Sequence, residues 1–171
     1  MSSRLAVPAL ALAVVLAAAP RADAQQRFVT SLEVAAGWVG FPDDGLVEER
    51  LVGGAARVQI TPRISVGPEI AHLAGSNHSH LIITANVTVD LRVDDGAASA
   101  RVTPFIVAGA GAFRTSERFP NGTFTSTEGS FTAGGGARVR LSDRVYVAGE
   151  ARVGWETHVR LQAALGVRLG S

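Results

Sequence analysis

The sequence predicts an all-β fold: an eight-stranded antiparallel up-and-down transmembrane barrel that follows a cleaved N-terminal signal peptide. Two observations lead to this prediction. Eight segments alternate apolar residues with polar or very small ones, and turn-rich segments separate them at regular spacing. After the N-terminal leader, no stretch carries a helical pattern or is apolar enough to span a membrane as a helix. We therefore expect a single antiparallel meander.

The clearest example of the pattern is the last segment, residues 159–169. Its odd positions are Val, Leu, Ala, Leu, Val and Leu, whereas its even positions are Arg, Gln, Ala, Gly and Arg. Because side chains alternate between the two faces of a strand, this segment has one apolar face and one polar or small face. Its length of about eleven residues is what a tilted transmembrane strand requires.

Residues 1–24 have the organisation of a secretory signal peptide. A positive start precedes an apolar run from Leu5 to Pro20, and Ala22-Asp23-Ala24 forms a small-x-small cleavage site. An uncleaved membrane anchor is the alternative, but the apolar run is short and is flanked by proline. We therefore expect cleavage before Gln25 and an outer-membrane barrel domain over residues 25–171.

The charge of the mature chain is balanced. The leader holds two of the 16 basic residues and one of the 15 acidic residues, so 14 of each remain. There is thus no basic surplus to indicate nucleic acid as a partner. Cysteine is absent, which excludes disulfide bonds and thiol chemistry in this exported protein. Backbone pairing and side-chain burial must supply its stability.

The first half of the mature chain predicts four strands, at about residues 28–39, 50–61, 64–73 and 81–92. Their apolar faces carry Phe28, Leu32, Val34, Ala36, Trp38, Val52, Gly54, Ala56, Val58, Ile60, Ile64, Val66, Ile70, Leu81, Ile83, Ala85, Val87, Val89 and Leu91. The opposite faces are polar or small. Pro68 weakens the ladder expected for the third strand, because proline has no backbone N–H to donate.

The second half predicts strands at about residues 102–114, 131–141, 145–155 and 159–169. The fifth strand is ambiguous because both of its faces are apolar or glycine. Phe105 and Phe113 share one face, and we expect that face to point outward. The segment from Thr115 to Gly129 is the longest and most polar connection, and it is expected to be an outer loop.

The alternation also fits a soluble ligand-binding barrel of the lipocalin or avidin type, which buries its apolar face. Three features favour the membrane barrel. The polar faces are rich in Gly, Ala, Ser and Thr, which fit the narrow interior of eight strands. Phe28, Trp38, Phe131 and Trp155 lie near strand ends, where interfacial aromatic girdles occur. With a periplasmic N-terminus, tight turns follow the second and sixth strands, and long loops follow the first and fifth.

Two segments carry a resemblance to a known family: Pro104-Phe105-Ile106-Val107-Ala108-Gly109-Ala110-Gly111 and Ala164-Leu165-Gly166-Val167-Arg168-Leu169. They resemble strands of the small eight-stranded outer-membrane barrels, the group that contains outer-membrane protein X and the transmembrane domain of outer-membrane protein A. The resemblance covers nearly all of the mature chain, although the usual terminal aromatic residue is absent. It implies a stand-alone, porin-like, monomeric barrel in the Gram-negative cell envelope, surrounded by outer-membrane lipid and folded by the barrel assembly machinery.

Charged residues on the inward faces form a predicted lumen ion-pair belt of Glu33, Arg57, Glu69, Arg138, Glu150, Arg152 and Arg160. Buried charges must be paired, because an orphan costs several kcal/mol. We expect alternating-sign pairs across neighbouring strands at mid-depth, including Arg160 with Glu33 where the last strand meets the first. Such a core leaves no room for a wide channel in so small a barrel. A narrow ion path that opens when pairs break is the alternative.

His78-Ser79-His80 is the one cluster that suggests an enzyme. Outer-membrane lipid A deacylases carry a His, a Ser and an acid on an eight-stranded barrel, but their His-x-Ser spacing is absent here and no acidic partner is evident. Two His at positions i and i+2 also suit weak metal binding. The simplest interpretation is a solvated polar loop.

The sequence therefore predicts a non-enzymatic outer-membrane barrel with a plugged, ion-paired interior and outer loops available for surface interaction. It predicts no catalytic residue, cofactor or metal. A lipid-modifying enzyme of the lipid A deacylase type and a secreted soluble barrel are the alternatives.

Overall fold

The computed structural model describes residues 30–41, 47–75, 78–91, 101–120, 122–155 and 157–169. The predicted signal peptide and Phe28 lie outside these ranges. Within them, no helix is both long and apolar enough to cross a membrane.

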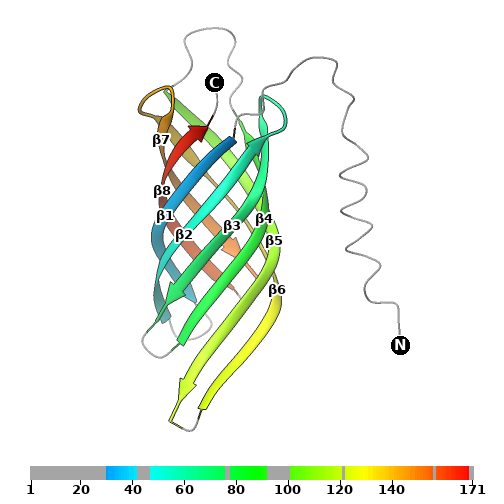
Figure 1. The fold of residues 1–171 in the computed structure, drawn as a ribbon, viewed down its shortest axis with the longest axis vertical. Coiled ribbons are helices and arrows are strands. Elements are labelled where there is room, and N and C mark those ends of the chain that lie inside the picture. The colour runs from blue at the N-terminus through cyan, green and yellow to red at the C-terminus, as the bar shows by residue number, and fades with distance from the viewer. Residues whose placement is uncertain are drawn as a thin grey trace, which may run out of the picture.

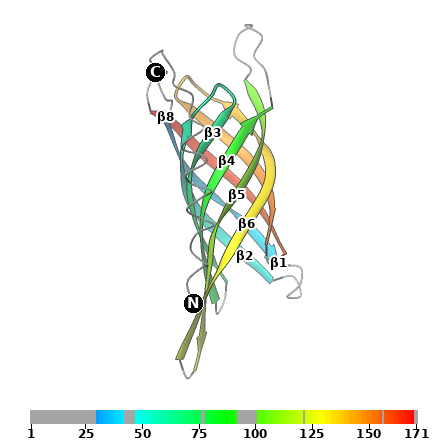
Figure 2. The same ribbon diagram turned by 90° about the vertical axis from the view of Figure 1, so that its right-hand side faces the viewer.

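Eight strands form one closed antiparallel barrel (Figures 1 and 2). They are β1 (Thr30–Phe41), β2 (Val47–Gln59), β3 (Ile64–Ala74), β4 (His78–Asp90), β5 (Val102–Phe119), β6 (Gly122–Arg140), β7 (Val145–Gly154) and β8 (His158–Leu169). Each strand pairs with the next in sequence, and β8 returns to pair with β1. The predicted eight-stranded antiparallel barrel is therefore confirmed.

The two ends of the barrel differ. The first residue of β1, Thr30, and the last residue of β8, Leu169, pair with each other at one end, which we call the terminus end. The opposite end carries the β5–β6 turn, which projects beyond the wall at the bottom of Figure 1. We call this end the hairpin end.

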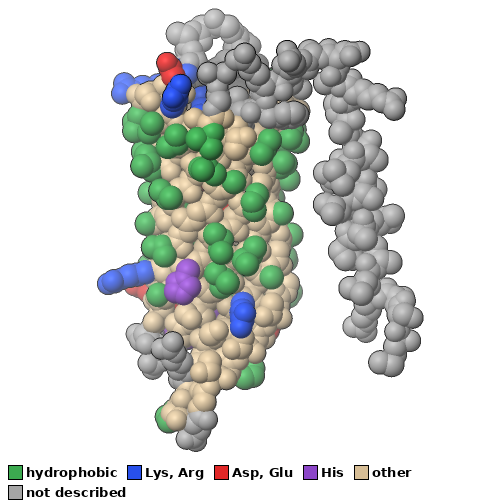
Figure 3. All heavy atoms as spheres, viewed as in Figure 1, with side chains coloured by type: hydrophobic (Ala, Val, Ile, Leu, Met, Phe, Trp, Pro, Cys, Tyr) green, Lys and Arg blue, Asp and Glu red, His purple; other side chains and the backbone are tan. Residues whose placement is uncertain are grey.

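Over the middle of the wall, apolar side chains cover the outside and buried charged side chains point inward, as expected for a membrane barrel. On β8, Leu161 is 49% exposed, whereas the adjacent Arg160 is only 1% exposed. Figure 3 shows apolar side chains over the outside of the wall. A soluble barrel of the lipocalin or avidin type would have the reverse orientation, so that alternative is excluded.

The predicted outward placement of Phe105 and Phe113 is wrong, because both side chains are buried inside the barrel. Phe105 packs where Gly136 of the neighbouring β6 has no side chain. Phe113 joins a buried apolar cluster with residues of β1 to β4. The outer face of β5 instead carries Ile106 and several alanines. The sequence left this strand ambiguous because both faces are apolar, and the space that glycine leaves in the lumen decides between them.

The predicted outer loop at residues 115–129 is also wrong, because this segment continues β5 and β6 as a long β-hairpin. Pairing extends from Val102↔Val139 to Phe119↔Gly122. Pairing between β6 and β7 begins only at Thr132↔Gly154, so residues 122–130 pair with β5 alone in the described part of the chain. The segment is polar, but alternating threonines at 123, 125 and 127 favour an extended backbone.

Close strand packing requires glycine in β3. A Cβ at Gly67 would overlap the carbonyl oxygen of Ala56 on β2. The adjacent Pro68 faces outward within β3, and it pairs in register with Ala85 of β4. On the other side of β3, pairing with β2 is interrupted between Ala55↔Glu69 and Val58↔Val66, while the register stays the same. The missing N–H of the proline is thus accommodated within a local gap in one ladder.

The outward orientation can be tested at Val34, a lipid-facing residue near the middle of β1 that is 64% exposed. Val34→Arg should lower the free energy of unfolding by ~2–4 kcal/mol, because it places a cation in the hydrocarbon region. Urea unfolding in lipid bilayers measures this change, with Val34→Leu as the matched apolar control. Equal stability of the two variants would contradict the assignment.

Candidate functional site

Six buried charged side chains occupy the middle of the lumen and are called here the inner charge network. They are Glu33 of β1, Arg57 of β2, Glu69 of β3, Glu150 and Arg152 of β7, and Arg160 of β8. Three carboxylates face three guanidinium groups, so the network has no net charge when all six side chains are ionised. Every one of the six is less than one tenth exposed.

Glu69 is the centre of this network. Its Oε2 accepts a hydrogen bond from Arg152 Nη2 at 2.8 Å, and its Oε1 accepts one from Arg160 Nη2. The Nη2 of Arg57 lies 3.7 Å from the same carboxylate, and Asn86 Nδ2 donates to Oε2 at 3.2 Å. One carboxylate of β3 therefore holds arginines from β2, β7 and β8, and the last two reach it across the lumen.

Glu33 organises the part of the network nearer the terminus end. Its Oε2 accepts from Arg57 Nε at 2.8 Å, and its Oε1 accepts from the Tyr146 hydroxyl at 2.7 Å. Arg57 also donates from Nη1 to Thr88 Oγ1 at 2.9 Å. These bonds connect β1, β2, β4 and β7 around the inside of the wall.

Glu150 closes the network on the β7–β8 side. Its Oε1 accepts from Arg152 Nε on the same strand and from Gln162 Nε2 at 2.9 Å. The Oε1 of Gln162 in turn accepts from Arg160 Nε, also at 2.9 Å. The neutral amide of Gln162 on β8 thus links the Glu150–Arg152 pair of β7 to Arg160.

The expected pair between Arg160 and Glu33 does not form, and the reason is the register. On β1 and β8, Glu33 is opposite Gly166, whereas Arg160 is opposite Val39. Gly166 and Arg160 are six residues apart, which corresponds to about 20 Å along a strand. Neighbouring strands therefore hold these two charges at different depths, and Arg160 reaches Glu69 across the barrel instead.

Arg138 lies apart from the inner charge network, at the mouth of the terminus end. Its Nη1 donates to Asp90 Oδ1 at 2.6 Å, and its guanidinium carbon lies 4.5 Å from the centre of the Phe105 ring. Arg138 lines a pocket that opens at this mouth and extends to Arg57 of the inner charge network. Among the described residues, Arg138 forms its ion pair with Asp90 rather than with another residue of the predicted belt.

An apolar layer fills the lumen between the inner charge network and the hairpin end. It consists of Val39, Phe41, Leu51, Ala71, Leu73, Ile82 and Phe113. The buried ring of His158 packs beside it, with centroids 5.8 Å from Phe41 and 6.3 Å from Phe113. Ions that enter from the hairpin end meet apolar side chains before they reach any charge of the network.

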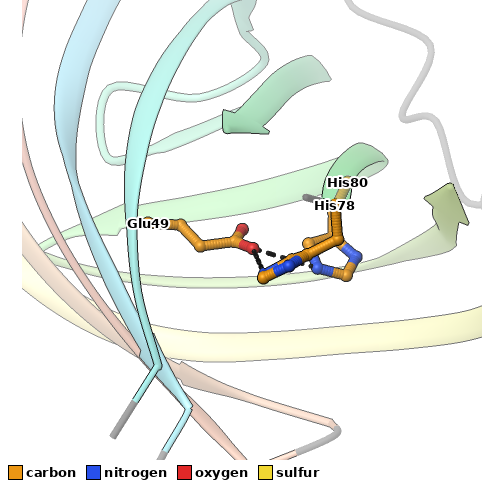
Figure 4. Close-up of side chains that lie close together, drawn as sticks. All are labelled: Glu49, His78 and His80. Carbon is orange, nitrogen blue, oxygen red and sulfur yellow. Dashed lines mark ion pairs between the residues drawn. The ribbon is translucent and has the colours of Figure 1, made fainter. Parts of the chain in front are cut away.

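The expectation that His78-Ser79-His80 forms a solvated loop is wrong. His78 and His80 belong to β4, and both ring Nε2 atoms approach Oε1 of the buried Glu49 on β2, at 2.5 and 3.2 Å (Figure 4). Ser79 lies between them on the strand and therefore faces the opposite side. A His–Ser–acid catalytic arrangement is not formed by these residues.

Glu49 is the residue that the sequence analysis missed. It precedes Leu51 by two positions, and both side chains are buried. The alternation of β2, extended two residues toward the N-terminus, places Glu49 on the same inward face as Arg57. A predicted second strand that began earlier would have identified Glu49 as an inward acid. The proximity of Glu49 to β4, however, depends on the tertiary structure of the barrel.

The family of the chain follows from a comparison of its sequence with protein families. The outer membrane protein beta-barrel domain family matches residues 9–167, which is most of the chain. The chain belongs to this family. It is accordingly an outer-membrane β-barrel protein, whose apolar wall contacts membrane lipid and whose interior holds buried ion pairs. No curated protein sequence matches it.

Three solved structures share the fold of this outer-membrane barrel. Neisserial surface protein A (NspA) aligns with a TM-score of 0.68 and 12% identity, over 83% of this chain and 97% of that chain. The N-terminal β-barrel domain of Pseudomonas aeruginosa OprF gives 0.66 and 10%, over 84% and 100%. Ail, the attachment invasion locus protein of Yersinia pestis, gives 0.55 and 13%, over 83% and 97%. At these identities the likeness establishes the fold alone.

The central role of Glu69 predicts a large effect of its removal. Glu69→Gln should lower the free energy of unfolding by ~3–5 kcal/mol, because Arg152 and Arg160 then remain buried without a full counter-charge. Urea unfolding of the refolded barrel in lipid measures the loss. Glu128→Gln on the exposed hairpin is the matched control and should change stability by no more than ~0.5 kcal/mol.

The double variant Glu69→Gln/Arg160→Gln distinguishes charge balance from simple loss of contacts. It removes one charge of each sign, so part of the lost stability should return. If Arg160→Gln lowers the free energy of unfolding of Glu69→Gln by as much as it lowers that of the parent chain, the result would contradict the network.

Proposed function

We propose that this barrel is a non-enzymatic outer-membrane protein whose interior is sealed and whose β5–β6 hairpin is available for interactions outside the cell. The observation that carries the proposal is the contrast between the lumen and the β5–β6 hairpin. Side chains close the lumen at two successive levels, while the hairpin extends β5 and β6 past the wall.

The sealed interior rests on the inner charge network and the apolar layer. The inner charge network links β2, β7 and β8 through Glu69. The apolar layer brings side chains of β1 to β5 into one buried cluster. An ion would have to break paired charges and also cross an apolar region, where its hydration is lost. Both steps are costly in a narrow lumen.

The hairpin end is inferred to face outward from the cell. Family barrels have short periplasmic turns and longer outer extensions, and the hairpin is the longest extension in the described structure. Near this end the rings of Phe131 and Trp155 contact each other at a tilt of 39°, with centroids 5.6 Å apart, and outward Arg50 and Arg114 lie beyond the apolar band. Aromatic and cationic side chains of this kind suit a membrane interface.

The hairpin has properties of an interaction surface. Phe119 and Phe124 are 56% and 58% exposed near its tip, and residues 122–130 leave one side of β6 without a ladder partner in the described structure. An exposed edge can pair with a strand of another molecule. The name of the similarly folded Ail, attachment invasion locus protein, is consistent with contact between such a barrel and another surface.

The remaining features of the proposal concern processing and assembly. Residues 1–24 are proposed to be a cleaved signal peptide, and residues 25–171 the mature barrel domain, which the barrel assembly machinery inserts as a monomer.

The lipid A deacylase alternative has no support from the described side chains, since Ser79 faces away from His78 and His80.

A sealed lumen predicts the absence of conductance. The mature chain, reconstituted in planar lipid bilayers in potassium chloride, should give no single-channel steps, because the lumen is blocked at two levels. A parallel bilayer with a known open porin is the control. Reproducible conductance steps from the folded barrel would contradict the sealed interior.

The hairpin can be tested by shortening it. Replacement of residues 116–125 by Asn-Gly joins Thr115 to Ser126, which are already opposite each other, through a two-residue turn. Cells that display the full chain should adhere to other cells or to coated surfaces, and cells with the shortened hairpin should lose this adhesion. A heat-modifiability gel verifies that both barrels fold. Equal adhesion of the two would exclude the proposed role of the hairpin.

A further inference from the structure

Three potential metal ligands meet inside the wall near the hairpin end, and neither the inner charge network nor the hairpin uses them. Glu49 comes from the start of β2, and His78 and His80 come from the start of β4 (Figure 4). One ligand atom from each lies within 4.8 Å of the other two. Because β3 lies between β2 and β4, only the closed sheet brings these residues together.

The carboxylate of Glu49 lacks the hydrogen bonds that a buried anion requires. Its side chain is 0% exposed, and within the described part of the chain neither oxygen accepts a hydrogen bond. The two imidazole Nε2 atoms are within ion-pair distance of Oε1, but they do not donate to it along a hydrogen-bond direction. A buried carboxylate in this state needs a cation close to it.

The ring of His80 is held in the orientation of a metal ligand. Its Nδ1 lies 3.0 Å from Thr115 Oγ1 on β5, and when Nδ1 donates this bond, the Nε2 atom, 3.2 Å from Glu49 Oε1, keeps a lone pair available for a metal ion. The rings of Phe41 and Phe113 pack against the imidazole, with centroids 5.6 and 4.9 Å away. Metal-binding histidines commonly use a partner for the second ring nitrogen in this way.

We propose that Glu49, His78 and His80 bind one zinc(II) ion at the hairpin end of the lumen. Two imidazoles and one carboxylate are a recurrent three-residue ligand set for zinc, with a fourth position left for water or another ligand. Tetrahedral coordination separates ligand atoms by about 3.3–3.5 Å. The His80–Glu49 distance of 3.2 Å is close to this value, and the His78–Glu49 distance of 2.5 Å must widen modestly. Calcium and magnesium are disfavoured because they prefer oxygen ligands.

The site is accessible from outside through one of its three ligands. The side chain of His78 is 28% exposed, which gives an ion a route to the otherwise buried carboxylate. A Cβ at Gly75 would be 2.7 Å from His78 Nε2 and 3.0 Å from Glu49 Oε1. The absence of a side chain at this glycine therefore leaves space next to the ligand atoms. Bound zinc would connect β2 to β4 across β3 and stabilise the hairpin end.

Zinc binding is tested with the full mature barrel, refolded in detergent and freed of metal with a chelator. Titration with zinc chloride, followed by calorimetry, should give saturable binding of one ion per chain. Cobalt(II), added in place of zinc, should give the visible absorption of a tetrahedral site. The temperature of the heat-modifiability transition should rise with zinc, because the ion binds the folded barrel only.

Matched variants show whether these residues are the ligands. Glu49→Gln and His80→Gln should each weaken zinc binding at least about 10-fold, and Thr115→Val should weaken it about 10- to 100-fold through loss of the second-nitrogen partner. His72→Gln is the control, because His72 is an exposed outward residue of β3 and should leave the affinity unchanged. If Glu49→Gln fails to fold, the partly exposed His78→Gln replaces it.

Two results would overturn the proposal. The first is the absence of saturable zinc binding to the folded barrel. The second is an affinity that is the same in Glu49→Gln, His78→Gln, His80→Gln and the parent chain, since the ion would then occupy another place. Neither result bears on adhesion by the hairpin, which is measured separately.

Discussion

The hydrogen-bond ladder between β1 and β8 is the constraint on which the rest of this barrel depends. In hydrocarbon no water is available to satisfy a free N–H or C=O, so an open sheet with two edges is not a possible membrane structure. Closure with eight strands leaves a lumen only wide enough for side chains. Each inward residue therefore faces residues on the opposite wall as well as residues on its neighbouring strands.

Closure explains why the interior charges pair across the lumen. Strand register sets Glu33 and Arg160 at different depths on adjacent strands, whereas the narrow lumen brings Arg152 and Arg160 to Glu69 on the opposite wall. The three carboxylates and three guanidinium groups then balance each other, and neutral Gln162 and Asn86 complete the contacts. A membrane barrel holds its hydrophobic residues outside, so this polar interior has the stabilising role that an apolar core has in a soluble protein.

The hairpin end has a different organisation. Apolar and aromatic side chains fill the lumen there, and the charged groups that approach Glu49 among the described residues are the imidazoles of His78 and His80. Its charge is not part of the balanced inner network, so the nearby imidazoles and any cation they bind must compensate it. The same end carries the extended β5–β6 hairpin. Its exposed aromatics, and the edge of β6 that has no ladder partner among the described residues, contrast with the closed wall.

Much of the fold was determined by the sequence alone, because the alternation of side chains is a local property of each strand. The clean alternation from Leu81 to Asp90 and from Val159 to Leu169 predicts the strands and the face of each residue. Where both faces are apolar, as around Phe105 and Phe113, alternation contains no such information. Residues 122–127 are polar, as in a loop, whereas their alternating threonines favour an extended strand, so the two local signals disagree.

The tertiary structure alone decided which inward residues meet. The alternation of side chains identifies six interior charges, but their partners depend on strand tilt, register and the diameter of the lumen. These six are Glu33, Arg57, Glu69, Glu150, Arg152 and Arg160. The contact between Glu49 and the two histidines has the same origin, since it joins β2 to β4 past an intervening strand. Local sequence fixes the face on which a side chain lies, whereas only closure of the barrel fixes its depth and the residue opposite it.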